Sequence, residues 1–256
     1  MQGGMSPLGR SEGLQRAGDD PHGENRLGRP TGVGVLLIAS ANRDKAREIV
    51  DLLAGLPVEL RTAAEVPGFR PPEETGATLE DNAILKARCA FEATGLPSLA
   101  DDTGLEVQAL GGRPGVRSSR YAGEGATYAD NVALLLREMA GVEEGARGAR
   151  FVTVVALYRG DGRILLFEGR VEGRIAARPR GTHGFGYDPV FLVPAVGKTL
   201  AEMTPAEKAR HGHRGAALRK LRAYLEGLRD PAEKAAPTDG LGHLEAIGAG
   251  SQPPRS

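Results

Sequence analysis

The sequence has one cysteine, no tryptophan and no surplus of charge of either sign. Cys89 alone cannot form an internal disulfide or a cysteine-rich zinc site, so we expect a reducing, cytoplasmic location. The 33 basic and 33 acidic side chains cancel, so the chain lacks the positive field that drives binding to DNA or RNA polymers. No apolar run approaches the roughly 18 residues of a membrane span. These absences predict a soluble protein with no polymeric nucleic acid and no membrane as partner.

Both ends of the chain are poor in aliphatic residues. Residues 1–32 are dominated by Gly, Arg, Ser, Pro and acids, and residues 230–256 by Pro, Gly, Ala and polar residues. Such segments bury too little apolar surface to offset the entropy of ordering. The first has no apolar core of a secretory signal and is not poor in acids, as a transit peptide would be. We predict one folded domain over residues 33–229 between a disordered N-terminal extension and a disordered C-terminal tail.

The start of this domain has the pattern of an α/β protein. The run Val33–Ile38 is short, continuous and apolar, which is typical of a strand buried on both faces. Asn42 can cap a helix directly after it, and capping boxes that begin at Thr78 and Thr127 predict two more helices. A last helix is expected around Leu218. Strand, turn and helix in this order favour an α/β fold with a parallel opening unit.

The middle of the domain is rich in strand signals. The segments Arg150–Tyr158 and Arg163–Ile175 are joined by Gly160-Asp161-Gly162, which indicates a β-hairpin. Before them, Leu99-Ala100 and Leu105-Glu106-Val107 have the pattern of two short strands on either side of an acidic turn. A hairpin after a parallel unit predicts a mixed sheet.

Two turns next to predicted helices could bind an anion. The turn Ser40-Ala41-Asn42-Arg43-Asp44-Lys45 joins the first strand to a helix N-terminus, where the helix dipole and a lysine favour negative charge. Lys208 and His213-Arg214 place further cations just before and at the start of the last helix. The alternative in each case is an ordinary capped or basic turn in contact with solvent.

Two acidic pairs could hold Mg²⁺, which prefers one or two protein carboxylates and takes its other oxygens from water and phosphates. Glu73-Glu74 lies in a loop bounded by Pro and Gly, and Asp101-Asp102 lies at a strand end. Each could equally be a solvated turn. Asp101-Asp102 is the stronger candidate because apolar residues flank it, where an unpaired carboxylate is costly.

The loop Gly184-Phe185-Gly186-Tyr187-Asp188 combines glycines, two aromatics and an acid, which suits stacking on a flat ring. The alternative is that Phe185 and Tyr187 pack into the core. The distribution of lysine favours a site. Only 6 of the 33 basic residues are lysines, and Lys45, Lys86, Lys198 and Lys208 lie in or beside the segments above. A compact ammonium suits a phosphate oxygen.

A series of spaced motifs carries a resemblance to a known family. The motifs are Leu37–Asn42, Glu73–Gly76, Asp81–Ala87, Ala100–Leu105, Leu110–Val116, Ser119–Gly123, Gly184–Pro189, Gly197–Thr199 and Glu207-Lys208 followed by His213-Arg214-Gly215. In this order they resemble the inosine triphosphate pyrophosphatase family, the non-canonical purine nucleoside triphosphate diphosphatases. The resemblance implies two α/β lobes around a long curved mixed sheet flanked by helices, with the active-site cleft between the lobes, and a homodimer.

The resemblance also implies an activity and residue roles. The family hydrolyses ITP, dITP or XTP to the monophosphate and pyrophosphate with Mg²⁺, which cleanses the nucleotide pool. Asp102 would be the general base and a metal ligand, and Glu73 the second metal ligand. The implied substrate-binding residues are Ser40, Ala41, Asn42, Arg43, Asp44, Lys45, Thr103, Phe185, Gly186, Tyr187, Asp188, Lys208, His213 and Arg214. Ser40-Ala41 departs from the usual Thr-Gly, and a Cβ there limits how closely the backbone approaches phosphate.

Two other functions have to be weighed. A non-catalytic purine nucleotide sensor would bind the same ligands, but binding alone does not require both the Glu73 and the Asp102 carboxylate. A dinucleotide oxidoreductase is disfavoured because no G-x-G-x-x-G motif follows the first strand.

Overall fold

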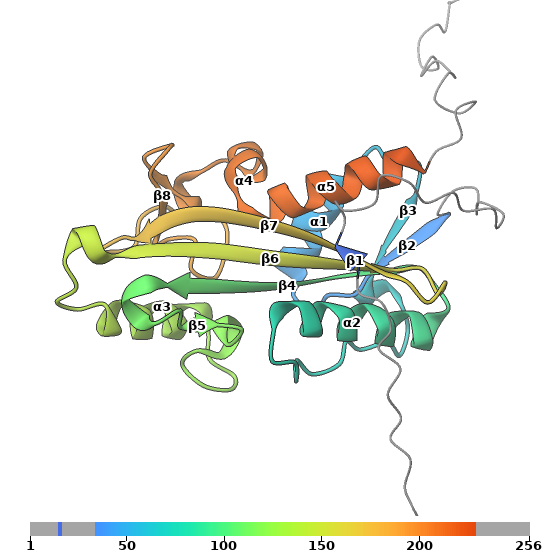
Figure 1. The fold of residues 1–256 in the computed structure, drawn as a ribbon, viewed down its shortest axis with the longest axis horizontal. Coiled ribbons are helices and arrows are strands. Elements are labelled where there is room, and N and C mark those ends of the chain that lie inside the picture. The colour runs from blue at the N-terminus through green and yellow to red at the C-terminus, as the bar shows by residue number, and fades with distance from the viewer. Residues whose placement is uncertain (1–14, 17–33, 229–256) are drawn as a thin grey trace, which may run out of the picture.

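The computed structural model describes residues 15–16 and 34–228, and these residues build a nine-stranded mixed sheet with helices on both faces (Figure 1). Helices α1 and α5 cover one face and α2 covers the other (Figure 1), while α3 packs at the far end of the long strands, against Leu105 and Phe151. The main strand order is β3-β2-β4-β6-β7-β8-β9, with β1 beside β7 and β5 beside β4. The strands are β1 Gln15–Arg16, β2 Val35–Ile38, β3 Glu59–Thr62, β4 Ser98–Val107, β5 Pro114–Gly115, β6 Gly148–Tyr158, β7 Ile164–Ile175, β8 Phe191–Val193 and β9 Lys198–Thr199. The α-helices are α1 Arg43–Leu53, α2 Leu79–Thr94, α3 Tyr128–Glu138, α4 Pro205–His211 and α5 His213–Gly227.

The sheet is parallel at one end and antiparallel in its centre. Strand β2 pairs in parallel with both β3 and β4, whereas β4, β6 and β7 pair antiparallel along nearly their whole lengths. These three long strands run the length of the molecule and curve with the sheet (Figure 1). The α/β fold with a long curved mixed sheet is therefore confirmed, and so is the hairpin of β6 and β7.

Local capping explains where the first three helices begin. The side chain of Asn42 accepts hydrogen bonds from the first turn of α1, and Thr78 and Thr127 form complete capping boxes at α2 and α3. Helix α2 ends at Gly95, which adopts φ +69°. One helix was missed. Thr204 and Glu207 form a capping box with Pro205 in the first turn, and this starts α4.

The prediction of two short strands around an acidic turn is wrong. Residues Ser98–Val107 form one continuous strand, β4, and Asp101 and Asp102 lie in its middle, both buried. The local sequence offers these two carboxylates no partners, which is why it favours a solvated turn. The partners come from helices far away in the chain, so tertiary contacts override the local polarity.

Within the predicted N-terminal extension the structure describes only Gln15–Arg16, which form β1. This short strand runs parallel to β7 opposite Leu165 and Leu166, on the edge of β7 that β8 leaves unpaired. The rest of residues 1–32 and the predicted tail over 230–256 lie outside the described residues. Within the part of the chain that is described, no helix is long and apolar enough to cross a membrane.

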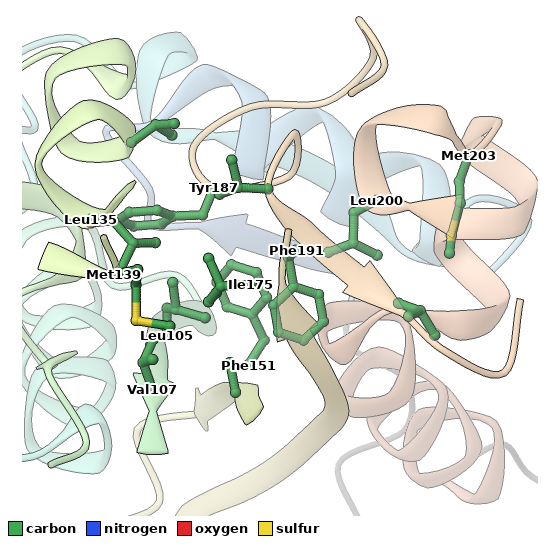
Figure 2. Close-up of a cluster of buried hydrophobic side chains, with 14 residues drawn as sticks. Leu105, Val107, Leu135, Met139, Phe151, Ile175, Tyr187, Phe191, Leu200 and Met203 are labelled. Carbon is green, nitrogen blue, oxygen red and sulfur yellow. The ribbon is translucent and has the colours of Figure 1, made fainter. Parts of the chain in front are cut away.

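Three clusters of buried side chains hold the layers together. One lies between the sheet and helices α1 and α5, and a second lies between the sheet and α2. The third, at the far end of the long strands, joins Leu105 and Phe151 to α3 and to the segment around Phe191 (Figure 2). The first two clusters lie on opposite faces of one end of the sheet, and the third lies at the other end. The molecule therefore has two lobes. Asp101 and Asp102 lie on β4 between them.

Candidate active site

The two adjacent aspartates of β4 serve opposite faces of the sheet, as successive residues of a strand must. Asp101 contacts Lys45 of α1 and Arg214 of α5, on one face. Asp102 contacts Asn82 and Lys86 of α2, on the other. Two neighbouring residues of one strand thus form ion pairs with residues of three helices, α1, α2 and α5.

All the contacts that Asp101 makes with cations and hydroxyls of the described residues go through one of its two oxygens. Its Oδ2 lies 3.4 Å from Lys45 Nζ and 3.1 Å from Arg214 Nη2, and it accepts a hydrogen bond from the Thr103 hydroxyl at 3.2 Å. Burial alone would raise the pKa of Asp101, but the charges of Lys45 and Arg214 outweigh it and hold that pKa well below its usual range. Its Oδ1 is buried without a hydrogen-bond partner among the described residues.

Asp102 has the opposite character. It accepts hydrogen bonds from Asn82 Nδ2 at 3.1 Å and from the Thr103 backbone N–H at 3.0 Å, and Lys86 Nζ lies at 3.5 Å. Burial raises the pKa of Asp102, and the nearby Glu74 carboxylate raises it further, while Lys86 and Lys45 oppose the shift without cancelling it. Of the two aspartates, Asp102 is therefore the better proton acceptor.

The acidic loop before α2 is anchored through its second glutamate. Glu74 Oε1 lies 2.7 Å from Lys86 Nζ, and Glu74 Oε2 lies 3.5 Å from Arg120 Nη1. Burial acts to raise the pKa of Glu74, but Lys86 and Lys45 outweigh it and the pKa is lowered. Glu73 is exposed and lines a cavity of about 620 Å³ together with Glu74 and Lys86. Its role as a metal ligand stays a prediction.

The turn before α1 is both a cap and a cavity wall. Asn42 Oδ1 accepts hydrogen bonds from the backbone N–H groups of Asp44 and Lys45 at 3.0 and 3.2 Å, so these two groups are not free for an anion. Ser40, Ala41, Asn42 and Lys45 nevertheless line the 620 Å³ cavity. The Asp44 carboxylate pairs with Arg47 at 2.7 Å and Arg43 is exposed, so neither side chain joins the aspartate cluster.

At the other end of the site, linked ion pairs place two cations, Lys208 and Arg214, over the ring of Phe185. Lys208 Nζ lies 2.6 Å from Glu48 Oε1, 2.5 Å from Asp188 Oδ2 and 4.6 Å from the centre of the Phe185 ring. Arg214 Nη1 lies 2.5 Å from the other oxygen of Glu48. Burial acts to raise the pKa of Glu48, but the two cations outweigh it and lower it. Burial prevails at Asp188, whose pKa is raised.

The two aromatic residues of the glycine-rich loop differ in how deeply they are buried, although both line the small cavity described below. Phe185 lines the cavities, whereas the buried Tyr187 ring belongs to the third core cluster (Figure 2) and its hydroxyl donates to the Ser118 carbonyl at 2.9 Å. Gly184 adopts φ +74°, and a Cβ there would lie 2.1 Å from Asp188 Oδ2. Gly186 also adopts a positive φ, +61°. The alternative of packing into the core therefore holds for Tyr187, and the stacking of Phe185 on a flat ring stays a prediction.

His213 is buried at the first turn of α5. Its Nδ1 lies 2.6 Å from the Thr153 hydroxyl, and its ring stacks on Phe151 at 4.5 Å between centres. Burial, assisted by the charges of Arg214 and Lys208, lowers the pKa of His213 well below its ordinary value, so the ring is neutral.

A small cavity of about 80 Å³ connects the two ends of the site through shared lining residues. It shares Asn42, Lys45 and Glu74 with the 620 Å³ cavity, and Phe185 and Lys208 with a third cavity of about 630 Å³. Asp102, Thr103, Gly186, Tyr187, Asp188, His213 and Arg214 also line it. The structure therefore brings together most of the predicted site residues in one elongated cleft.

Three residues of the site, Glu48, Asn82 and Thr153, escaped the prediction from sequence, and Lys86 was named there only as a lysine beside the predicted segments. Glu48 lies one helical turn after Lys45, a spacing that places the two on one face of α1. Asn82 lies four residues before Lys86, so these two also share one face of a helix, α2. Thr153 lies in an apolar strand, and no local signal distinguishes it.

A cleft with cations and carboxylates at one end and an aromatic ring at the other defines a binding site for a flat, polyanionic ligand. The family model of the Ham1 family matches residues 36–224. The chain is 51% identical over 195 residues to a dITP/XTP pyrophosphatase of Thermus thermophilus, covering 75% of this chain and 92% of that protein. It is 47% identical over 197 residues to a dITP/XTP pyrophosphatase of Yersinia pseudotuberculosis, covering 76% and 98%.

The solved structures agree. A HAM1 protein from Coxiella burnetii matches with a TM-score of 0.68 at 44% identity, covering 75% of this chain and 98% of that one. The chain belongs to the Ham1 family. The resemblance to the inosine triphosphate pyrophosphatase family is thereby confirmed.

Proposed function

We propose that the chain is a nucleoside triphosphate diphosphatase that hydrolyses ITP, dITP and XTP to the monophosphate and pyrophosphate and so cleanses the nucleotide pool. The observation that carries the proposal is the single cleft with Asp102, Lys45 and Lys86 at one end and Phe185 and its ion pairs at the other. The similarity to dITP/XTP pyrophosphatases over nearly their full lengths supports it.

The residues divide the work by position. Lys45 and Lys86 neutralise phosphate oxygens, and Phe185 stacks on the purine. Asp102 accepts the proton of the attacking water as the water oxygen bonds to the α-phosphorus and pyrophosphate leaves. Phosphoryl chemistry of this kind needs mainly positioning and charge neutralisation, and the raised pKa of Asp102 suits a base.

We propose Mg²⁺ as the cofactor. No group of three or more His, Cys, Asp or Glu side chains among the described residues forms a metal cage. The donors fit Mg²⁺ all the same, because it binds through one or two carboxylates and substrate phosphates, and Asp102 and Glu73 line adjoining cavities. When bound, the ion would neutralise charge on the phosphates.

The test measures pyrophosphate release from ITP, dITP, XTP, GTP and ATP, with and without Mg²⁺. We expect hydrolysis of the first three to exceed that of ATP and GTP and to require the metal. Equal turnover of all five would contradict the specificity, and tight ITP binding without turnover under any divalent metal would favour a sensor. Asp102→Asn should abolish most activity, whereas Glu143→Gln, an exposed carboxylate, should leave it unchanged.

We propose further that the enzyme is a cytoplasmic homodimer. The dimer is supported by the family resemblance, and the reducing compartment by the single cysteine, Cys89, whose thiol is free. Light scattering that gives twice the monomer mass is the expected result for the assembly. A monomer at working concentration would contradict it.

A further inference from the structure

A row of small residues crosses the sheet beneath the first turn of α5. Thr103 of β4 lies opposite Thr153 of β6, and Thr153 lies opposite Gly169 of β7. A Cβ on Gly169 would lie 2.1 Å from the His213 carbonyl oxygen and 2.4 Å from the Ala217 nitrogen. The missing side chain therefore lets α5 approach the sheet and sets His213 beside Thr153.

Two residues of β6 fix the His213 ring. Phe151 and Thr153 are two apart on the strand, so both face α5. Phe151 stacks on the imidazole with 24° between the planes, and the Thr153 hydroxyl meets Nδ1 at 2.6 Å. Thr153 itself is fully buried. The ring is thus held by a face contact and by a hydrogen bond.

Which atom donates in the hydrogen bond between Thr153 and His213 follows from the hydrogen bonds that connect Thr153, through Thr103, to Asp101. Thr103 Oγ1 accepts from Arg214 Nη2 at 3.1 Å, lies 2.8 Å from Thr153 Oγ1, and lies 3.2 Å from Asp101 Oδ2. Arginine only donates, and an ionised carboxylate only accepts. Thr103 has one proton, and a bond to a carboxylate is about twice as strong as one to a neutral hydroxyl. Thr103 therefore donates to Asp101.

The remaining protons are then determined. Because Thr103 has given its proton to Asp101, it can only accept from Thr153, so the Thr153 hydroxyl donates to Thr103. Thr153 has no second proton for His213, and the neutral ring must donate from Nδ1. Neutral imidazole has one N–H, so Nε2 keeps its lone pair. Nε2 has no hydrogen-bond partner among the described residues, and His213 lines the cleft.

We infer that Thr153 is a positioning residue that holds His213 in the Nδ1–H form, and that Nε2 thereby becomes an acceptor for the N1–H of a 6-oxopurine base. This inference rests on the proposed function. Hypoxanthine, xanthine and guanine carry a proton on N1, whereas N1 of adenine has a lone pair. Adenine would place a lone pair against a lone pair and leave both unpaired.

The first test measures the tautomer in the ligand-free protein, by nitrogen NMR of the imidazoles. The His213 signals are identified by their loss in His213→Asn. We expect a protonated Nδ1 and a bare Nε2 in the wild type and in Thr153→Ser, and a shift toward protonated Nε2 in Thr153→Val. A wild-type ring protonated at Nε2 overturns the inference, and so does an unchanged ring in Thr153→Val.

The second test compares kcat/KM for ITP, GTP and ATP. In Thr153→Val we expect ITP and GTP to fall together by about tenfold, mainly through KM, the equivalent of one hydrogen bond, while ATP is unchanged. Thr153→Ser should restore both. The matched control is Thr199→Val, another fully buried threonine, whose hydroxyl donates to the Arg180 carbonyl; it should leave the ITP to ATP ratio unchanged.

The outcomes separate the inference from the function on which it rests. An equal fall for all three nucleotides would mean that Thr153 only supports the fold, and it would overturn the inference. A wild-type protein that hydrolyses none of them would refute the proposed function, while the NMR result would still decide the tautomer. Circular dichroism of each variant checks that it folds.

Discussion

Replacing Asp101 by Asn tests whether buried charge holds α1 and α5 on the sheet. The Asp101 side chain is fully buried and Arg214 is 4% exposed, so the substitution removes one of the two carboxylates that pair with this buried cation. Breaking such a pair from one side costs about 3–5 kcal/mol. Arg214 keeps Glu48 as a partner, so we expect the low end, about 3 kcal/mol. For a domain of this size the melting temperature should fall by roughly 6–12 °C.

The assay is urea unfolding followed by far-ultraviolet circular dichroism, because the chain has no tryptophan to report by fluorescence. Glu59→Gln is the matched control. Glu59 pairs with Arg61 at 2.6 Å, but both side chains are about half exposed, and such a pair is worth at most about 1 kcal/mol. The reasoning is refuted if Asp101→Asn costs no more than Glu59→Gln.

We also expect the stability difference between the wild type and Asp101→Asn to depend on pH. The pKa of Asp101 in the folded protein lies below the ordinary value of 3.8, so its ionised form stabilises the folded state above that value. This stabilisation is lost as the pH falls from 3.8 through the folded-state pKa. The difference in unfolding free energy between wild type and Asp101→Asn should therefore be constant near neutral pH and narrow below 3.8. A difference that widens on acidification would contradict the sign.

Three further substitutions probe packing and recognition. Gly169→Ala should destabilise the protein by about 1–3 kcal/mol and lower ITP hydrolysis, because its Cβ would collide with the backbone of His213; Gly145→Ala, with nothing within 4 Å, is the control in thermal unfolding. Phe185→Ala should raise the KM for ITP about tenfold through lost stacking, in steady-state kinetics. Arg147→Lys should cost about 2–3 kcal/mol in urea unfolding, because its buried guanidinium donates to four carbonyl oxygens. These belong to Met139, Val142, Ile175 and Ala176.

Local patterns predicted the elements but not the strand that carries the chemistry. Asn42, Thr78 and Thr127 start helices by capping, which depends on residues within one turn, so sequence was sufficient. Asp101 and Asp102 look like a turn because two adjacent carboxylates have no local partners. Their partners come from three helices, and only the fold brings these together.

The site shows the same division. The motifs predicted the loops that line the cleft, since each motif is local. Glu48 and Thr153 became visible only through their contacts, Glu48 by linking Lys208 to Arg214 and Thr153 by linking Thr103 to His213. Spacing puts Glu48 on the face of α1 that holds Lys45, but it does not show that Glu48 joins two cations from other helices. Residues that act between other side chains are the ones that local spacing fails to reveal.

The charge balance of the cleft indicates that the base, more than the phosphates, decides which nucleotide binds. Within the described residues, each cation of the site already has a carboxylate partner. The cations are Lys45, Lys86, Arg120, Lys208 and Arg214, and their partners are Glu48, Glu74, Asp101, Asp102 and Asp188. A triphosphate must compete with these carboxylates for the cations, so its phosphates alone gain little net electrostatic energy. Discrimination then depends on groups whose hydrogen bonds a base either completes or leaves unpaired, and His213 is such a group at the aromatic end of the cleft.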